Sequence, residues 1–182
     1  MDSKLQIISG KYRGKKLNLP PLARPTQNLA RGALFNMLNE ILDMSQPFVV
    51  WDVFGGSGAF GLECLSRYDN AKVVFTDNSN SSIDVIKKNV KSIDCDAIIE
   101  KTDAIAVISK FGATADLIFV DAPYSEFDVG AAFVKKLTTF AKIGAILIWE
   151  FEKIHDMPMI DGWNVIKNKT YGRARFLMLK KK

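Results

Sequence analysis

The sequence predicts an α/β fold built on a mostly parallel, doubly wound sheet, and three observations support this prediction. Short apolar runs typical of buried strands alternate with helical patterns through most of the chain. One of these runs, 49–54, leads through a glycine-rich turn into a helical pattern. The 182 residues, 48% of them hydrophobic, suffice for one compact domain with its own core.

Residues 1–45 are expected to form an appendage on a main domain that spans 46–182. The apolar runs 5–8 and 17–19 flank a basic, glycine-punctuated loop, which predicts a hairpin. Three prolines then force extended chain. In 29–42 the apolar residues recur at helical spacing, which predicts an amphipathic helix.

The chain is organised around the strand at 49–54 and the glycine turn after it. Glycines make the turn, Ser57 is a candidate helix cap, and 59–67 has helical spacing. The free N–H groups at such a helix start, and a backbone that a ligand can approach closely, predict a ligand site. A tight turn without a ligand is the alternative interpretation.

The later elements follow from the same patterns. Apolar runs predict strands, helical spacing predicts helices, and two runs around a turn-like Y-G-R predict a closing antiparallel pair. The expected strands are 72–76, 97–100, 115–120, 145–149, 163–166 and 175–179, and the expected helices are 81–90, 104–110 and 127–140.

Acidic residues lie at or just beyond the ends of the first three main strands. Asp52 would repel a pyrophosphate but suits the cationic amino group of S-adenosylmethionine. Asp77 follows the next strand, where a nucleoside ribose is held in such folds, although it could instead cap a helix. Asp103 could accept a hydrogen bond from an adenine amino group, cap the following helix, or do both.

The stretch D-A-P-Y ends the strand at 115–120. Asp121 and the carbonyl of Ala122 can both accept hydrogen bonds from an exocyclic amino group, which would aim its nitrogen at a methyl donor. Pro123 fixes the turn, and Tyr124 offers an aromatic face to a flipped base. Such catalysis by positioning needs neither a nucleophile nor a metal; the alternative is a strand-ending turn with a packing tyrosine.

Charge and composition narrow the class of partner. The net charge is +5, and basic residues crowd the N-terminal stretch, which favours a polyanion such as nucleic acid. Tyr12 in this stretch could stack on a base or pack in a hairpin. One histidine and two isolated cysteines predict no metal site and no disulfide. The absence of a signal peptide or a long apolar run predicts a cytoplasmic protein without a membrane anchor.

Several motifs in the right order resemble the RsmD family, bacterial methyltransferases that modify the exocyclic N2 of a guanine in small-subunit ribosomal RNA. The matching stretches are L-Q-I-I-S-G-K-Y-R-G-K-K-L (5–17), R-P-T (24–26), R-G-A-L-F-N (31–36), D-V-F-G-G-S-G-A-F-G-L-E-C-L-S-R (52–67), D-A-P-Y (121–124) and Y-G-R-A-R-F-L (171–177). Departures from the family pattern are Ser9, Asn28, Gly32 and Ala122, the last of which keeps the backbone acceptor while loosening the loop.

The resemblance implies a Rossmann-like class I methyltransferase with a seven-stranded sheet and an N-terminal β-hairpin. It implies that S-adenosylmethionine is the cofactor and that a monomer acts on 16S ribosomal RNA, within the small ribosomal subunit or its assembly intermediate. The cofactor would be held by Asp52, Phe54, Gly55, Gly56, Ser57, Gly58, Asp77, Asn78, Asp103 and Ala104. The guanine would be held by Asp121, Ala122, Pro123 and Tyr124, and the RNA by Lys11, Tyr12, Arg13, Lys15, Lys16, Arg24, Thr26 and Arg31.

Three alternatives remain open from the sequence. An NAD-binding oxidoreductase shares the glycine pattern and Asp77, but no residue is placed as an obvious acid for hydride transfer. An adenine-N6 nucleic-acid methyltransferase shares the acidic-Pro-aromatic loop. An RNA-binding protein that has lost turnover is the third, because Ala122 departs from the family loop.

Overall fold

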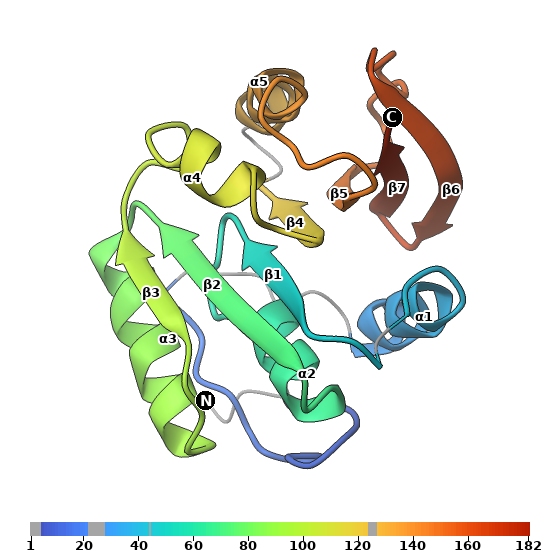
Figure 1. Cartoon of the computed structure of the whole chain (residues 1–182). Helices are drawn as coiled ribbons and strands as arrows, with labels where there is room; N and C mark the ends of the chain where they lie inside the picture. The colour runs from blue at the N-terminus through green and yellow to red at the C-terminus, as the bar shows by residue number, and fades with distance from the viewer. Residues whose placement is uncertain (1–4, 22–27, 44, 124–126) are drawn as a thin grey trace.

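One twisted sheet runs through the protein and carries helices on both faces (Figure 1). The computed structural model describes residues 5–21, 28–43, 45–123 and 127–182. Within these ranges the strands are β1 (Phe48–Asp52), β2 (Ala71–Asp77), β3 (Ile98–Lys101), β4 (Leu117–Asp121), β5 (Ile146–Glu152), β6 (Trp163–Tyr171) and β7 (Ala174–Lys181). The helices are α1 (Asn28–Asn39), α2 (Ala59–Arg67), α3 (Asn80–Ser92), α4 (Ile108–Gly112) and α5 (Phe127–Leu137).

Seven strands of the described chain form the sheet in the order β3-β2-β1-β4-β5-β7-β6. The five strands from β3 to β5 are parallel, whereas β7 pairs antiparallel with both β5 and β6. The predicted α/β class with a mostly parallel, seven-stranded sheet is therefore confirmed. Because parallel strands end at the same edge, the residues that follow β1, β2, β4 and β5 come together there.

The two faces of the sheet bury separate apolar clusters. Helices α1, α2 and α3 cover one face, where the rings of Phe60 and Phe119 stack with centroids 4.0 Å apart. Helices α4 and α5 cover the other, where Trp51 and Phe133 meet edge to face. Side chains alternate along a strand, so Trp51 enters one cluster and its neighbour Val50 enters the other. No helix within the described ranges has the length and apolar character needed to cross a membrane.

The N-terminal segment, residues 5–19, packs on the face covered by α2 and α3. Its predicted β-hairpin is reduced to a single antiparallel bridge between Gln6 and Lys16, with Leu5 and Leu17 buried in the first cluster. The reason is that several N–H groups beyond the bridge donate to side chains of the main domain instead of extending the pairing. Asn18 N, for example, donates to Asn89 Oδ1 of α3 at 2.8 Å.

A buried carboxylate in α2 holds this segment in place. Glu63 is fully buried, and its two oxygens accept hydrogen bonds from Ile8 N at 2.8 Å and Ser9 N at 2.9 Å. Arg67 Nε donates to the same carboxylate at 2.7 Å, and Arg31 Nε of α1 lies 3.7 Å from it. Glu63 therefore joins the N-terminal segment, α1 and α2 at one point, and these partners offset the cost of burying its charge.

The largest differences from the predicted elements are at element ends. The helix expected at 104–110 begins only at Ile108, because Asp103 Oδ1 accepts from Ile105 N at 2.7 Å and residues 104–107 form a turn. β6 extends to Tyr171, well beyond the expected 163–166, because polar residues continue the pairing with β7.

Replacing Glu63 by alanine should lower the free energy of unfolding by about 3 kcal/mol or more, because Arg67 Nε and two backbone N–H groups lose their acceptor and the buried Arg31 loses its nearby carboxylate. Urea denaturation would measure this. The matched control is Glu40→Ala, since Glu40 pairs with Lys167 at the surface and its loss should cost about 1 kcal/mol or less. Equal effects of the two changes would show that Glu63 is not an anchor.

Candidate active site

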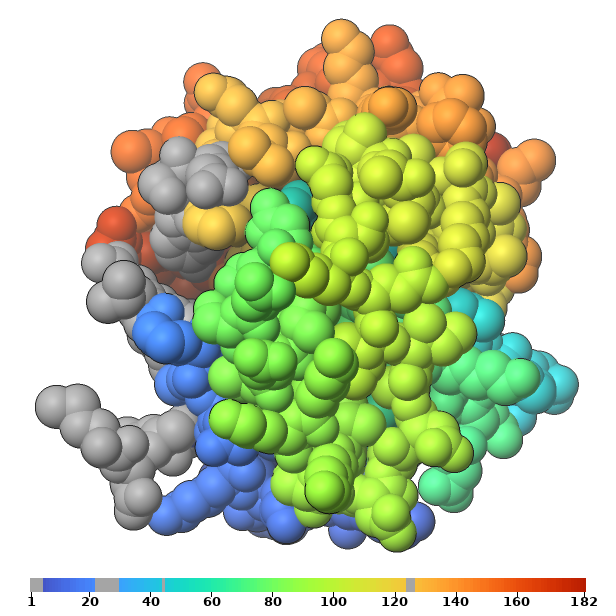
Figure 2. Space-filling view, turned by 90° about the vertical axis from the view of Figure 1, so that its left-hand side faces the viewer, coloured from blue at the N-terminus to red at the C-terminus, as the bar shows by residue number. Residues whose placement is uncertain are grey.

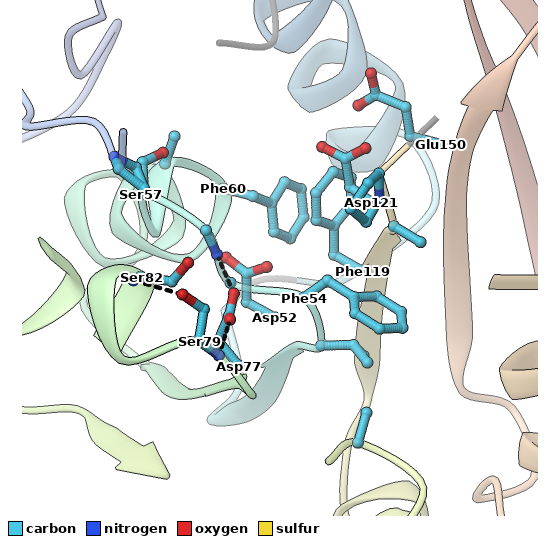
Figure 3. Close-up of a pocket in the computed structure, with 18 of the residues that line it drawn as sticks. Asp52, Phe54, Ser57, Phe60, Asp77, Ser79, Ser82, Phe119, Asp121 and Glu150 are labelled. Carbon is cyan, nitrogen blue, oxygen red and sulfur yellow. Dashed lines mark hydrogen bonds between the residues drawn. The ribbon is translucent and has the colours of Figure 1, made fainter. Parts of the chain in front are cut away.

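A cavity of about 1100 Å³ lies at the edge where the parallel strands end. Its walls come from the turn after β1, the ends of β2, β4 and β5, part of α1, and the turn between β6 and β7 (Figure 3). Pockets for a single small ligand usually measure about 300–1,000 Å³, so this one has room for a cofactor and part of a second ligand. All but one of the described residues predicted to bind the cofactor or the acceptor base line it: Asp52, Phe54, Gly55, Gly56, Ser57, Asp77, Asn78, Asp103, Ala104, Asp121, Ala122 and Pro123. The exception is Gly58, the N-cap of α2, which follows the lining residue Ser57.

The glycine turn forms a cradle along the cavity wall. Gly56 and Gly58 have φ angles of 54° and 75°, which side chains other than glycine rarely adopt. Gly58 is the N-cap of α2, so the prediction that Ser57 caps this helix is wrong. The Ser57 carbonyl instead accepts from Asn89 Nδ2 at 2.8 Å, which ties the turn to α3.

Two carboxylates at the rim shape the backbone around them. Asp77 accepts from Gly56 N at 2.9 Å and Ser79 N at 2.8 Å, one bond to each oxygen, and so fixes the glycine turn against β2. Each carboxylate oxygen can accept a second hydrogen bond, so Asp77 can hold the turn and a ligand at once. Asp103, exposed at the rim, caps a turn at Ile105 N in the same way.

Asp52, the last residue of β1, is 2% exposed and its Oδ2 accepts from Gly61 N at 3.1 Å. Burial raises the pKa of Asp52 to about 8; the hydrogen bond from Gly61 opposes this shift, and the neighbouring charges of Asp121 and Asp77 add to it. The carboxyl group is therefore mostly neutral at pH 7 in the absence of a ligand. A cation placed beside it would favour its ionised form.

The acceptor loop follows β4. Asp121 is half-buried on the cavity wall, Ala122 is buried, and Pro123 is exposed. Phe119 precedes Asp121 by two residues and faces the same side of the sheet, where it stacks on Phe60 and gives the cavity an aromatic floor (Figure 3). Tyr124 lies outside the described residues.

Four of the described basic residues predicted to bind RNA, Lys11, Arg13, Lys15 and Lys16, do not line the cavity. Lys11 N donates to Ser66 O at 2.7 Å, and the Tyr12 hydroxyl accepts from Cys95 Sγ at 3.1 Å, which places their turn beside the last residues of α2 and the start of β3. α2 begins at the cavity and leads away from it, so this turn lies toward the opposite edge of the sheet (Figures 1 and 2). Lys15 and Lys16 are exposed on the same segment, as is Arg13.

Arg31 requires a correction. The sequence predicted that it contacts RNA, but it is 2% exposed, its Nη2 donates to the Gln6 carbonyl, and it lies beside Glu63. Burial lowers the pKa of this guanidinium, which the charge of Glu63 opposes. Arg31 therefore secures the N-terminal segment from inside and also contributes to the cavity wall. Arg24 and Thr26, also predicted to bind RNA, lie outside the described residues.

Sequence reasoning missed Glu150, which lines the cavity near the end of β5 and is 3% exposed. The signal was present, because Glu150 directly follows the apolar run 145–149, much as Asp77 and Asp121 follow theirs. It also missed Tyr171 and Arg173, which reach the cavity from the turn between β6 and β7.

The charge of the lining decides which ligands fit. Among the described residues, the cavity lining has five carboxyl groups, from Asp52, Asp77, Asp103, Asp121 and Glu150, and two guanidinium groups, from Arg31 and Arg173. Such a lining attracts a cation and repels the pyrophosphate of a dinucleotide. Together with the glycine cradle, it is compatible with S-adenosylmethionine, whose sulfonium and ammonium groups outnumber its one carboxylate.

The chain is similar in sequence to a family of known proteins. The family described as Conserved hypothetical protein 95 matches residues 5–180. Ribosomal RNA small subunit methyltransferase D from Escherichia coli K12 is 34% identical over 122 residues, which cover 66% of this chain but only 60% of that protein. The Haemophilus influenzae protein of the same name is 31% identical over 183 residues, covering 92% of this chain and 89% of its own.

Solved structures agree with the fold. The structure of yhhF from Escherichia coli has a TM-score of 0.84 at 25% identity and covers 98% of both chains. The Thermus thermophilus 16S rRNA N2 G1207 methyltransferase RsmC has a TM-score of 0.65 at 18% identity over 88% of this chain and 45% of its own. The predicted Rossmann-like fold of class I methyltransferases is confirmed.

Exchanging Asp52 for asparagine should change how stability depends on pH in the ligand-free protein. The pKa of Asp52 is about 8 in the folded protein and near the ordinary 3.8 in the unfolded chain. The stability that protonated Asp52 contributes is therefore fully present below pH 3.8 and is lost as the pH rises through 8. The free energy of unfolding of Asp52→Asn, relative to that of the wild type, should rise by about 1 kcal/mol per pH unit between about pH 5 and pH 8. Urea titrations at several pH values measure the difference, and a constant difference would mean that Asp52 is ionised throughout.

Proposed function

The chain belongs to the Conserved hypothetical protein 95 family, the RsmD family, and we propose that it transfers a methyl group from S-adenosylmethionine to the exocyclic N2 of a guanine in 16S ribosomal RNA. One observation carries the proposal. Asp52, Asp77 and Asp121 end three neighbouring parallel strands and line one acidic cavity that has room for a cofactor and a base. The names of the relatives support the ribosomal RNA substrate.

The cofactor would lie along the glycine cradle, where S-adenosylmethionine supplies a methyl group attached to positively charged sulfur. Asp52 would accept a hydrogen bond from its amino group, and Asp77 would accept from its ribose hydroxyls. Asp103 would accept from the adenine amino group beside Ala104 and the partly buried Ile105. The acidic lining favours the sulfonium and ammonium groups of this ligand over an anionic group such as a pyrophosphate.

The acceptor loop would then position the base. Asp121 and the carbonyl of Ala122 would accept the two hydrogens of the guanine amino group, so that its nitrogen faces the methyl donor. When N2 bonds to the methyl carbon, the bond from that carbon to sulfur breaks and its electron pair stays on sulfur. N2 then loses one proton, which the Asp121 carboxylate would accept. This reaction needs no covalent intermediate with the protein. A guanine in structured RNA must leave its stack to enter the cavity.

The basic turn would contact the RNA at a distance from the reacting base. Lys11, Arg13, Lys15 and Lys16 are exposed, and the turn lies near the far end of α2, whose nine residues span about 14 Å. Contacts between lysine or arginine and phosphate fix the position of an RNA without reading its sequence. The substrate would be 16S ribosomal RNA in the small subunit or its assembly intermediate, met in the cytoplasm by a monomer.

The alternative functions are less consistent with the site. An NAD-binding oxidoreductase would place a pyrophosphate among the five carboxyl groups of the cavity. An adenine-N6 methyltransferase could use the same loop, but the relatives' names favour ribosomal RNA. A protein that binds RNA without turnover would still bind the cofactor but would transfer no methyl group to RNA. The second experiment below distinguishes this case.

Cofactor binding can be measured by calorimetry with S-adenosylhomocysteine, the demethylated product. The wild type should bind it and should not bind NAD. Asp77→Ala should weaken binding about 10- to 100-fold, because a charge-assisted bond to the ribose and the support of the glycine turn are both lost. Asp84→Ala, an exposed position on α3, is the matched control and should leave the affinity unchanged. If the protein bound NAD and not S-adenosylhomocysteine, the assignment of S-adenosylmethionine as the cofactor would be wrong.

Methyl transfer should be tested with labelled S-adenosylmethionine and small-subunit particles that lack the modification, followed by identification of the labelled nucleoside by mass. We expect N2-methylguanosine. Asp121→Ala should reduce the rate about 100-fold or more while cofactor binding persists, because the amino group loses an acceptor that orients it. Asp156→Ala, at an exposed loop position, serves as the control.

Two results would contradict this function. If the label were found on adenine, S-adenosylmethionine would still be the cofactor, but the assignment of guanine as the methylated base would be wrong. Cofactor binding without transfer to particles, to their assembly intermediates or to free 16S RNA would identify a protein that binds but does not methylate.

A further inference from the structure

Glu150 lies directly beside the proposed acceptor residue. β4 and β5 are parallel, and their register pairs Asp121 with Glu150. Paired residues on neighbouring strands project to the same face of a sheet, and neighbouring strands are about 4.8 Å apart. Both side chains line the cavity, and Figure 3 shows Glu150 next to Asp121 on the side away from Asp52.

Glu150 differs from the next acidic residue of β5 in its place relative to the cavity. Glu150 is 3% exposed and lines the cavity, whereas Glu152, two residues further along the strand, does not line it. A carboxylate oxygen has several lone pairs and can accept more than one hydrogen bond. Glu150 is therefore placed to accept a hydrogen bond from a ligand that enters the cavity beside Asp121.

The two purines differ in what they would offer to this pair of carboxylates. The edge of guanine that carries the N2 amino group also carries the N1–H, so it presents adjacent donors. The equivalent edge of adenine presents its amino group next to N1, which is a hydrogen-bond acceptor. Asp121 and Glu150, when ionised, can only accept, so together they complement guanine and oppose the lone pair of adenine N1.

We propose that Glu150 accepts a hydrogen bond from the N1–H of the guanine whose amino group is held by Asp121, and that it thereby selects guanine over adenine. This inference rests on the proposed function of the site. Glu150 is a residue that binds and orients the base; the methyl group and the N2 proton move without it. A site built to bind a donor rejects a ligand that lacks it, because the buried acceptor then has no partner.

The test replaces the methylated guanine, once its position is known from the labelling experiment, by 2-aminopurine in a synthetic segment ligated into the RNA. This base keeps the reacting 2-amino group but has a lone pair at N1 in place of the N1–H. The measured quantity is the ratio of kcat/KM for guanine to kcat/KM for 2-aminopurine. Comparing the ratio between enzymes cancels the intrinsic difference in reactivity of the two bases.

Glu150→Gln should lower this ratio about 10-fold or more relative to the wild type, because the amide can donate to the N1 lone pair that the carboxylate repels. Glu152→Gln makes the same chemical change on the same strand, away from the cavity lining, and should leave the ratio unchanged. Binding of S-adenosylhomocysteine by Glu150→Gln at wild-type affinity would show that the cavity is intact.

The outcomes separate the two proposals. If the wild type methylates guanine and Glu150→Gln keeps the wild-type ratio, Glu150 does not recognise N1–H and the inference is overturned. The inference is also overturned if Glu152→Gln lowers the ratio equally. If the wild type transfers no methyl group to guanine, the proposed function itself fails, and this is seen before any variant is made.

Discussion

Parallel pairing of β1 with β2 and β4 is the constraint on which the site depends. The register aligns these strands so that their carboxyl ends, and the acids that follow the apolar runs, meet at one edge. The arrangement has a cost, since Asp52 is buried close to Asp77 and Asp121 and its ionised form is disfavoured. Such an acidic cluster is costly to the ligand-free fold and becomes favourable when a cation enters it. A cation that binds there relieves the repulsion that destabilises the ligand-free protein, and this relief contributes to the affinity for the cation.

The buried carboxylate of Glu63 links this edge to the N-terminal segment. α1 contributes Ala30 and Leu34 to the cavity wall, and its buried Arg31 lies against Glu63 in α2. The N-terminal segment is bonded to the same carboxylate through Ile8. The Glu63 carboxylate therefore helps to position both the basic turn and one wall of the cavity, although these lie at different ends of α2.

The sequence predicted the parts of the fold that depend on local pattern. Buried strands such as 115–120 are read from apolar runs, and the position of Asp121 follows from the end of its strand. The prediction failed where a distant partner decides the outcome. Arg31 has the sequence character of a surface arginine, and only the packing of α1 on α2 reveals its burial beside Glu63. β6 continues through polar residues because β7 pairs with them, which no periodicity in β6 itself indicates.

Basic and acidic residues lie at opposite edges of the sheet, and this arrangement would affect how an RNA is oriented on the protein. Exposed basic residues of the N-terminal turn would attract phosphates at one edge of the sheet, whereas the charged groups that line the cavity at the other edge are mainly carboxyl groups among the described residues. A phosphate would be repelled from the cavity, but a guanine edge that offers hydrogen-bond donors to Asp121 and Glu150 would not. On the proposed function, the electrostatics that keep the RNA backbone outside would therefore still admit a flipped base, so that one distribution of charge would serve both to orient the substrate and to select its base.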